Sequence, residues 1–327
     1  MPIAPRPVRS ILFVPGNRQD RMRKSLTMGA DAVIFDLEGA VPRGELPEAR
    51  KMVTQVVADA HAHAADGATG DGDSGGGVDS GGDGGGDSSA RAAIFVRVGD
   101  ARSGDRIRSD MEAAIGAGLA AIVLPQVADV TDVVKADELM TEIEAAAGVP
   151  VGQTVLVPLM ETANAVRTAY EIATCSPRVA YMGSGISKRG DIARSIGYRA
   201  TDAGLETLFM RSKVLIDVRA AGIFNPISGM WSVIEDLYGL RVFAEGTRDL
   251  GYDGMMVIHP SHIPVVNEVF TPTAEEVAEW QEVIDMMTEA QEHGIGVIRY
   301  KGAIVDEAHV LTAHQSLAFA ARLGVTP

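Results

Sequence analysis

The chain has 327 residues, of which 46 % are hydrophobic, and its formal net charge is −15 at pH 7. This length suits two ordinary domains or one large α/β barrel. A field this negative repels polyanions, so we expect neither a nucleic acid nor an anionic membrane surface as a partner. An acidic, lysine-poor composition would suit a salt-rich cytoplasm, and a GC-rich genome would produce the same bias.

Cysteine usage and the N-terminal segment both favour the cytoplasm. Cys175 is the single cysteine, so the chain forms no intramolecular disulfide and has no cysteine-based metal site. The first ten residues lack the apolar core of a signal peptide, and no apolar run approaches the length of a membrane helix. We therefore predict a cytoplasmic protein in a reducing compartment.

Eight short aliphatic runs, each bounded by turn residues, are the predicted strands. They cover residues 10–15, 32–38, 92–98, 120–125, 154–160, 178–183, 221–226 and 254–260. Most are almost continuously apolar, which is typical of strands covered on both faces in a parallel sheet. Segments with helical spacing separate them, for example 162–173, 204–220 and 236–251. The alternation predicts an α/β fold, the TIM (β/α)8 barrel.

An open, doubly wound sheet is the alternative fold, but its usual marker is missing. The glycine-rich segment 183–190, GSGISKRG, carries Lys188 where a dinucleotide-binding fingerprint requires its third glycine. The segment also lacks the Gly-Lys-Ser/Thr of a Walker motif. We interpret it as a loop that follows a strand.

The predicted barrel occupies residues 1–272, and residues 273–327 form a C-terminal helical extension or lid. Within the barrel, residues 66–89 are rich in Gly, Asp and Ser. Such a segment cannot bury enough apolar surface to offset its ordering entropy, so we predict a disordered insert. A calcium-binding repeat is the alternative, but the regular apolar position of such repeats is absent.

Polar residues stand where the predicted strands end, and this is the end at which an α/β barrel carries its chemistry. They are Asp36, Glu38, Arg97, Gln126, Glu161, Asp191 and His259. Carboxylates that converge from different strands are costly unless a cation neutralises them. Glu161 and Asp191, together with waters, suit Mg²⁺. Each acid taken alone would equally suit the first turn of a helix.

Two arginines allow a structural and a functional interpretation. Arg97, near the end of a strand, would be an expensive buried charge unless it pairs with Asp36 or Glu38 or binds an anionic substrate. Both interpretations can hold together. Arg9 has the same two interpretations, but it lies at the entry of its strand.

Several motifs in a fixed order carry a family resemblance that covers most of the chain. They are RSILFVPGNR, FDLEGAV, FVRV, LPQV, VPLMETANAV, GYDGMMVIHPSHI and KGAIVDEAHV, which begin at residues 9, 35, 95, 124, 157, 251 and 301. In these motifs the chain resembles the citrate lyase beta subunit and malyl-CoA lyase family of magnesium-dependent C–C lyases. The resemblance implies a TIM barrel that binds Mg²⁺, with Mn²⁺ as the alternative ion, and assembles as a homotrimer or homohexamer.

The resemblance also implies a role for each matched residue. Glu161 and Asp191 correspond to the metal ligands of the family, and Glu161 also contacts the substrate. Arg97 corresponds to its catalytic arginine and also binds substrate, while Arg9 corresponds to an arginine that anchors the substrate. Asp306 corresponds to a catalytic acid that malyl-CoA lyases deliver from a neighbouring subunit.

The acidic motif of residues 35–41 is assigned a supporting role by the same resemblance. Asp36 and Glu38 are expected to hydrogen-bond the waters of the metal and to orient Arg97. The chain departs from the family pattern at Gly39, where an aspartate is usual, and at Gln126, where a lysine is usual. These two changes lie near the expected substrate and nucleotide environment, so they leave the exact substrate open.

The activity that follows from this resemblance is carbon–carbon bond cleavage or formation through an acyl-CoA enolate. The expected substrate is a CoA thioester such as malyl-, methylmalyl-, citramalyl- or citryl-CoA, with glyoxylate, pyruvate or oxaloacetate as the 2-oxo acid. Three alternatives stay open: an aldolase acting on free 2-oxo acids, a malyl-CoA thioesterase, and a barrel subunit without catalysis. Identification of the products would separate the enzymatic alternatives.

Overall fold

A computed structural model describes residues 6–68, 91–186, 189–201 and 204–326. The chain forms two compact units, Met1–Asn267 and Glu268–Pro327, and each is described by itself. The predicted disordered insert falls largely outside the described residues. Helix α2 (Leu46–Ala68) extends three residues into that segment.

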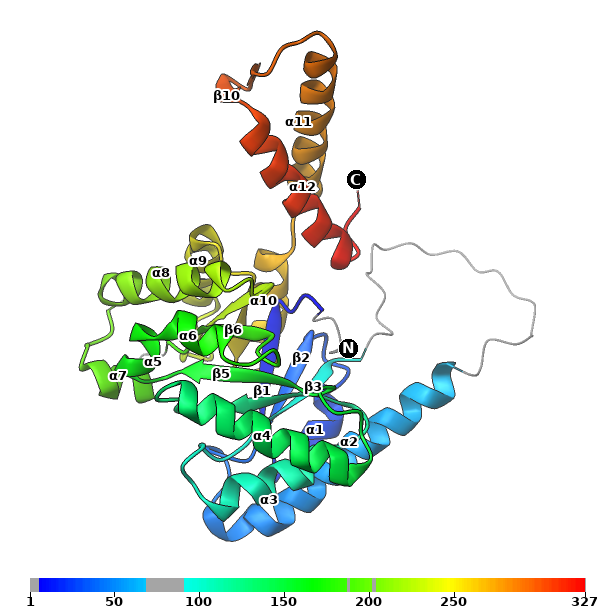
Figure 1. Cartoon of the computed structure of the whole chain (residues 1–327), viewed down its shortest axis with the longest axis vertical. Helices are drawn as coiled ribbons and strands as arrows, with labels where there is room; N and C mark the ends of the chain where they lie inside the picture. Colours follow the sequence, from blue (N-terminus) through cyan, green and yellow to red (C-terminus); the bar gives the residue numbers. More distant parts are fainter. Residues whose placement is uncertain (1–5, 69–90, 187–188, 202–203, 327) are drawn as a thin grey trace. The chain divides into compact units, whose positions relative to one another are not determined.

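The first unit is a closed barrel of eight parallel strands, each hydrogen-bonded to the next in sequence order, with β8 pairing to β1 (Figure 1). The strands are β1 (Ser10–Pro15), β2 (Ala32–Asp36), β3 (Ala93–Arg97), β4 (Leu119–Leu124), β5 (Val155–Met160), β6 (Tyr181–Ser184), β7 (Asn225–Ser228) and β8 (Gly254–Val257). The predicted TIM-barrel fold is confirmed. All carboxyl ends of the strands therefore lie at one end of the barrel.

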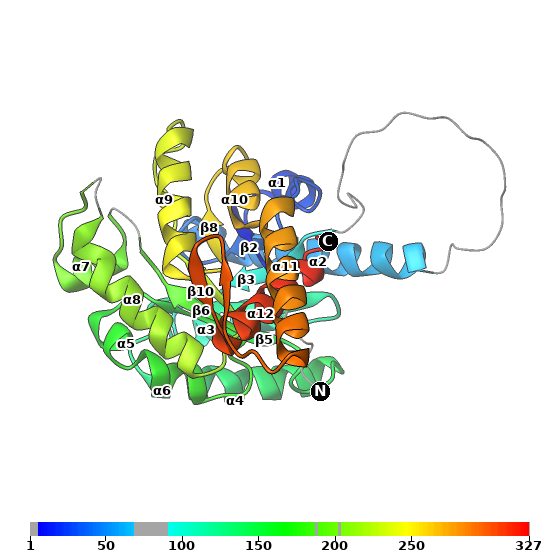
Figure 2. The same cartoon turned by 90° about the horizontal axis from the view of Figure 1, so that it is seen from above.

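Helices connect the strands and lie outside them, and Figure 2 shows α4, α6, α5 and α8 following one another along one side of the barrel. The helices before β6 are α1 (Gln19–Ser25), α2, α3 (Asp105–Ala114), α4 (Val130–Ala147), α5 (Ala163–Arg167) and α6 (Ala169–Thr174), and a 3-10 turn, η1, covers Arg43–Glu45. Those after β6 are α7 (Asp191–Ile196), α8 (Leu205–Ala220), α9 (Leu237–Leu250) and α10 (His262–Phe270).

Two element boundaries differ from the sequence-based prediction. Strand β7 begins at Asn225, whereas we predicted a strand over 221–226. Residues 221–223 instead close helix α8, because their N–H groups donate to carbonyls of its last turn and Gly222 has a φ of 78°. The helix predicted over 162–173 is divided into α5 and α6 at Thr168.

The interior of the barrel is packed with aliphatic and aromatic side chains. Phe95 and Tyr181 are among them, with ring centroids 5.5 Å apart. At the amino-terminal end, the buried Asn225 side chain accepts a hydrogen bond from the N–H of Val8 and donates one to its carbonyl. A side chain at Gly183 would overlap with the carbonyl oxygen of Ile227, so glycine permits the close approach of β6 to β7.

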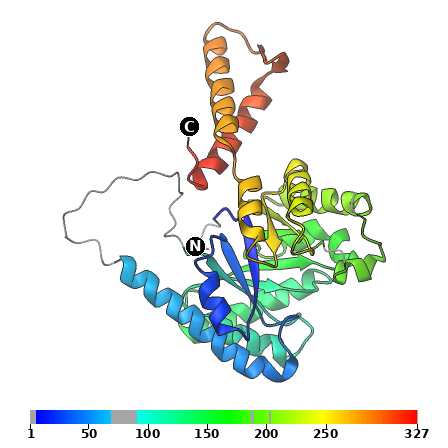
Figure 3. The same ribbon diagram turned by 180° about the vertical axis from the view of Figure 1, so that it is seen from behind.

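The second unit is a helical hairpin with a small antiparallel sheet. Helices α11 (Ala274–Glu292) and α12 (Glu307–Arg322) lie side by side, as Figure 3 shows from behind. Strands β9 (Ile298–Tyr300) and β10 (Ala303–Val305) are joined by Lys301 and Gly302, both at positive φ, as a tight hairpin turn requires. No helix in the described part of the chain has the length and apolarity to cross a membrane.

Candidate active site

Strands β2 and β3 bring an acid and an arginine together at the carboxyl end of the barrel. Asp36 and Arg97 are register partners at the last positions of these strands. The Nε of Arg97 donates to Oδ1 of Asp36 at 2.8 Å, and Nη2 donates to Oδ2 at 2.7 Å. Their side chains are only 16 % and 3 % exposed, so the pair is a buried, bidentate ion pair.

Asp36 is also held by its own loop. Its Oδ1 accepts the N–H of Glu38 at 2.8 Å, and its Oδ2 accepts the N–H of Ala40 at 2.9 Å. Burial opposes ionisation, but the hydrogen bonds and charge of Arg97 and these two N–H groups together lower the pKa of Asp36. Asp36 is therefore a fixed carboxylate that anchors Arg97.

Arg97 lies between acidic and aromatic neighbours. Its Nη2 is 3.4 Å from Oε2 of Glu38, and its guanidinium carbon is 4.9 Å from the centroid of the Phe13 ring. Burial disfavours the cation, yet Asp36, Glu38 and Glu161 raise the pKa of Arg97, so it stays charged. A Cβ at Gly39 would stand 3.0 Å from the same Nη2, so a side chain there would crowd the guanidinium.

Glu161 follows β5 and faces the same group of charges. Its Oε2 accepts the main-chain N–H of Gln126 at 2.9 Å. Burial raises the pKa of Glu161, and the nearby carboxylates of Asp191 and Glu38 add to this, against the opposing influence of Gln126 and Arg97. Burial likewise raises the pKa of Glu38. The site thus holds carboxylates that a cation would stabilise in the charged form.

Asp191 is the first residue of α7, and its side chain is 29 % exposed. Its Oδ1 lies 2.5 Å from Nη2 of Arg194, one turn along the helix. Its Oδ2 accepts a long hydrogen bond, 3.4 Å, from the side-chain amide of Gln126. Gln126 therefore contacts both acids that the sequence proposes as metal ligands.

Gln126 has an unusual backbone for a residue with a side chain, with a φ of 51°. Its carbonyl accepts a hydrogen bond of 2.7 Å from Nη2 of Arg102. A residue other than glycine in this left-handed backbone conformation stores local strain, and such residues concentrate at functional sites. The sequence marked position 126 as a departure from the family but gave no sign of this bridging geometry.

Arg106 on α3 is a supporting residue that the sequence analysis missed. Its Nη2 donates to the carbonyl of Leu37 at 2.9 Å, which ties α3 to the loop that carries Asp36 and Glu38. Asp110, which is fully buried, lies 3.7 Å from Nε of Arg106 and accepts from Arg50 and from the N–H of Gly99. No sequence motif marks Arg106, because its partners include main-chain carbonyls.

Arg9 does not join this group, and its expected substrate contact stays a prediction. It precedes β1 and so lies at the amino-terminal end of the barrel, opposite Arg97. Its Nε and Nη2 donate to the two carboxylate oxygens of Asp31 at 2.8 and 2.7 Å, and its N–H donates to Oδ2. The structural interpretation of Arg9, a salt bridge, is the one that the geometry favours.

Asp306 belongs to the second unit and caps α12. Its Oδ1 accepts the N–H of Ala308 and lies 2.7 Å from Nδ1 of His309. The hydrogen bond with His309 lowers the pKa of this exposed carboxyl. A proton donor needs the opposite shift, so within this single chain Asp306 has a capping geometry rather than the surroundings of a general acid.

The donor set at the barrel end fits a magnesium ion. No group of three or more His, Cys, Asp or Glu side chains in the described ranges forms a ready-made metal cage. Mg²⁺ does not need one, since it commonly takes one or two carboxylates and keeps waters or substrate oxygens elsewhere. Glu161, with its raised pKa, and the partly exposed Asp191 supply such a pair.

The fold and this group of charged residues define the class of protein: an α/β barrel with acids and an arginine converging at the carboxyl ends of its strands. The model of the HpcH/HpaI aldolase/citrate lyase family matches residues 9–69 and 87–260. The chain therefore belongs to the HpcH/HpaI aldolase/citrate lyase family, as its motifs predicted.

Relatives within this family carry two different names. The chain is 31 % identical over 314 residues to a (3S)-malyl-CoA thioesterase of Cereibacter sphaeroides (strain ATCC 17025 / ATH 2.4.3), covering 95 % of this chain and 94 % of the relative. It is 30 % identical over 312 residues to the citrate lyase subunit beta of Leuconostoc mesenteroides subsp. cremoris, covering 95 % and 93 %. The similarity thus extends into the C-terminal unit.

A solved structure shares the fold. The CitE protein of Mycobacterium tuberculosis, in complex with magnesium, acetoacetate and coenzyme A, superposes with a TM-score of 0.68 at 23 % identity. The match covers 96 % of this chain and 98 % of that protein.

Proposed function

We propose that the chain is a magnesium-dependent carbon–carbon lyase that cleaves or forms a β-hydroxyacyl-CoA of the malyl type. The observation that carries this proposal is the arrangement of Arg97, held by Asp36, near Glu161 and Asp191, which Gln126 bridges. Family membership and the magnesium and coenzyme A bound by the Mycobacterium tuberculosis protein support the choice of metal and of thioester.

Glu161 and Asp191 are the proposed metal ligands. Magnesium, when bound, supplies a Lewis acid that polarises the hydroxyl and carboxylate oxygens of the fragment that becomes the 2-oxo acid. Gln126 donates a hydrogen bond to each of these carboxylates. Asp36 and Glu38 keep Arg97 in place beside them.

Arg97 is the proposed catalytic arginine. Its Nε and Nη2 are directed to Asp36 and Glu38, and within the described residues Nη1 has no acceptor. Nη1 is therefore available to donate to an oxygen on which negative charge develops. A preorganised donor of this kind is typically worth about 3–4 kcal/mol in the transition state.

With malyl-CoA as the example, the bond that breaks joins the carbon bearing the hydroxyl to the methylene carbon next to the thioester. The hydroxyl proton passes to a water molecule, the carbonyl of glyoxylate forms, and the bonding electron pair moves into the thioester enolate. That enolate then takes up one proton on carbon and becomes acetyl-CoA. We assign this proton to Asp306 of a neighbouring subunit in a homotrimer or homohexamer, from the resemblance to malyl-CoA lyases. The role requires that Asp306 leave its hydrogen bond with His309, which lowers its pKa.

A thioesterase is the second candidate, and the name of the Cereibacter sphaeroides relative favours it. The same polarising site would then direct water at the thioester carbonyl, and malyl-CoA plus water would give malate and free CoA. An aldolase that uses pyruvate as the enolate and a non-catalytic barrel remain further alternatives. The retained Arg97, Glu161 and Asp191 argue against the non-catalytic reading.

Product identification tests the proposal. Malyl-, methylmalyl- and citramalyl-CoA, and in parallel a free hydroxy-oxo acid, would be incubated with the chain and Mg²⁺, and the products identified by mass. An acyl-CoA shortened by the 2-oxo acid supports the lyase, whereas the intact hydroxy acid with free CoA supports the thioesterase. Turnover only of free hydroxy-oxo acids would show an aldolase, and no turnover of any of them would contradict the proposal.

A further inference from the structure

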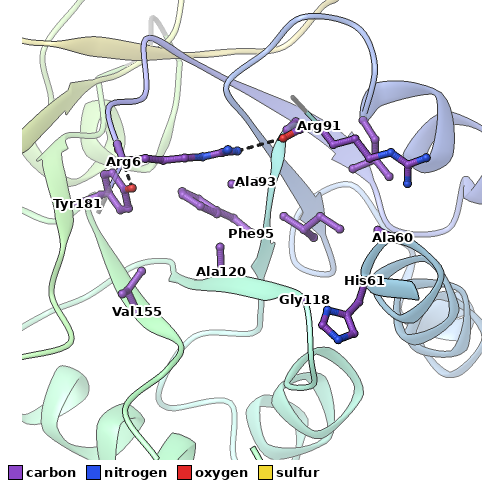
Figure 4. A pocket seen from close by; sticks show the side chains of 13 residues that line it. Arg6, Ala60, His61, Arg91, Ala93, Phe95, Gly118, Ala120, Val155 and Tyr181 are labelled. Carbon is purple, nitrogen blue, oxygen red and sulfur yellow. Dashed lines mark hydrogen bonds between the residues drawn. The ribbon is translucent and has the colours of Figure 1, made fainter. Parts of the chain in front are cut away.

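A cavity of about 460 Å³ opens at the end of the barrel opposite the candidate active site (Figure 4). We call it the basal pocket. Its inner wall comes from residues at or next to the start of four strands: Ala93 of β3, Ala120 of β4, Val155 of β5 and Tyr181 of β6. A volume of this order lies within the range typical of small-molecule sites.

The inner wall of the basal pocket is apolar and partly aromatic. Phe95 and Tyr181 lie on it, and both belong to the interior packing of the barrel. Ala93 and Ala120 leave room where larger side chains would close the barrel end. An apolar group that entered here would replace water against carbon, which stabilises binding in proportion to the area covered.

The rim of the basal pocket is basic. Arg6, His61 and Arg91 line it, and no described lining residue has a carboxylate. The whole chain carries 44 acidic residues against 29 lysines and arginines, so a cavity with basic groups alone is a distinct local environment. The nearby Asp31 does not alter this, because its carboxylate pairs with Arg9.

Arg6 is fixed by main-chain groups, whereas the side chains of its two basic companions have no partner among the described residues. Its Nη2 donates to the carbonyls of Asp31 and Arg91, and its own carbonyl accepts from the hydroxyl of Tyr181 at 2.9 Å. The side chains of Arg91 and His61 are exposed and make no hydrogen bond or ion pair with any residue in the described ranges. Figure 4 shows them on the same side of the cavity, across from Tyr181 and Val155.

We propose that the basal pocket binds a small amphiphilic carboxylate. The apolar part of the ligand lies against Phe95 and Tyr181, and its carboxylate lies at the rim beside Arg91 and His61. This site is separate from the proposed lyase chemistry, because its residues occupy the opposite ends of the strands from Arg97 and Glu161. Its test is therefore independent of whether the chain is a lyase.

Octanoate is the probe that combines both features, and acetate and 1-octanol each carry one of them. Calorimetric titration of the full chain should show one octanoate site, with acetate and 1-octanol binding much more weakly. Arg91→Ala should weaken octanoate binding about tenfold, as the loss of one charge-assisted hydrogen bond would. Arg108→Ala, at another exposed arginine, is the matched control and should leave the affinity unchanged.

A second variant, Ala120→Leu, fills the inner wall and should abolish octanoate binding while Arg91→Ala only weakens it. Three results would overturn the proposal: no octanoate binding to the full chain, equal affinity for octanoate and 1-octanol, or unchanged affinity in both variants. A variant lacking residues 69–90 that gains binding absent from the full chain would also overturn it, since the chain itself would then cover the pocket.

Discussion

Arg97 and Asp36 form two parallel hydrogen bonds, 2.8 and 2.7 Å long, between the last residues of neighbouring strands. The pair converts an otherwise costly buried cation into a directed donor at the mouth of the barrel. Nε and Nη2 are used by the protein, which leaves Nη1 for a substrate. Loss of Asp36 should therefore lower both stability and turnover, whereas replacement of Arg97 by lysine should lower mainly turnover.

Asp36→Asn should cost about 3 kcal/mol of folding stability, because Arg97 would remain buried without its counter-charge. Turnover should fall about 100-fold or more, because the guanidinium loses its orientation. Denaturant unfolding and steady-state kinetics measure the two effects. A variant with native stability and native turnover would contradict the role of this pair.

Arg97→Lys keeps the charge but loses the two-pronged contact. We expect Arg97→Lys to lose less folding stability than Asp36→Asn does. Its turnover should fall about 100-fold below that of the wild type. Arg108→Lys is the control, because Arg108 pairs with Glu142 on the surface. Equal kinetics for Arg97→Lys and the control would show that the guanidinium geometry is not needed.

Glu161→Gln and Asp191→Asn should each weaken Mg²⁺ binding by more than about tenfold without loss of the fold. Isothermal titration of the free protein measures this without any assay of activity. Glu138→Gln, at an exposed acid on α4, is the matched control. If both site variants bind Mg²⁺ like the control, the ion lies elsewhere or is not bound.

Two substitutions of Gln126 distinguish the contribution of its side chain from that of its backbone conformation. Gln126→Ala removes the amide that contacts Asp191 but keeps the positive φ, whereas Gln126→Gly removes the amide and relieves the strain. Both should weaken Mg²⁺ binding by a similar factor, about tenfold. The glycine variant should be more stable than the alanine variant by about 0.5–1 kcal/mol. Unchanged Mg²⁺ affinity in both would remove Gln126 from the site.

The sequence predicts the barrel because its strands are nearly continuous apolar runs. It proposes Asp36 and Glu161 because they are acids at strand ends, and Asp191 through the family resemblance of its motif. It misplaces the start of β7, because the closing turn of α8 uses residues that look like a strand. The resemblance implies a substrate-anchoring role for Arg9, and its salt bridge to Asp31, 22 residues along the chain, is identified only in three dimensions. The bridge made by Gln126 depends on a main-chain N–H and a positive φ, and neither leaves a pattern in the sequence.

Asp253 provides a test of pH dependence away from the active site. Burial raises its pKa from 3.8 to about 6, although Arg219 opposes the shift. The native state therefore takes up this proton at a higher pH than the unfolded chain. The resulting stability is present in full below about pH 4 and is lost as the pH rises through about 6, with a size of about 1–3 kcal/mol.

Unfolding free energies measured from about pH 4 to pH 7 for the wild type and Asp253→Asn would reveal this contribution. The unfolding free energy of the wild type should fall relative to that of Asp253→Asn as the pH rises across this range. Asp249→Asn, at an exposed acid on α9, should run parallel to the wild type. A pH-independent difference for Asp253→Asn would contradict the raised pKa.

Asp306→Asn should abolish turnover while the assembled protein still binds Mg²⁺, if this residue supplies the proton from a neighbouring subunit. Size-exclusion chromatography with light scattering and magnesium titration would confirm that assembly and metal binding persist. Glu307→Gln, at the next residue, is the control. Full activity in Asp306→Asn would exclude the assignment without affecting the roles of Glu161 and Asp191.

The central claim is that an acyl-CoA enolate forms and is then protonated. The most direct measurement is cleavage of malyl-CoA in D₂O with Mg²⁺, followed by mass analysis of the CoA products. We predict acetyl-CoA with one deuterium in its methyl group, together with glyoxylate. Free CoA and malate without acetyl-CoA, or acetyl-CoA without deuterium, would contradict the account.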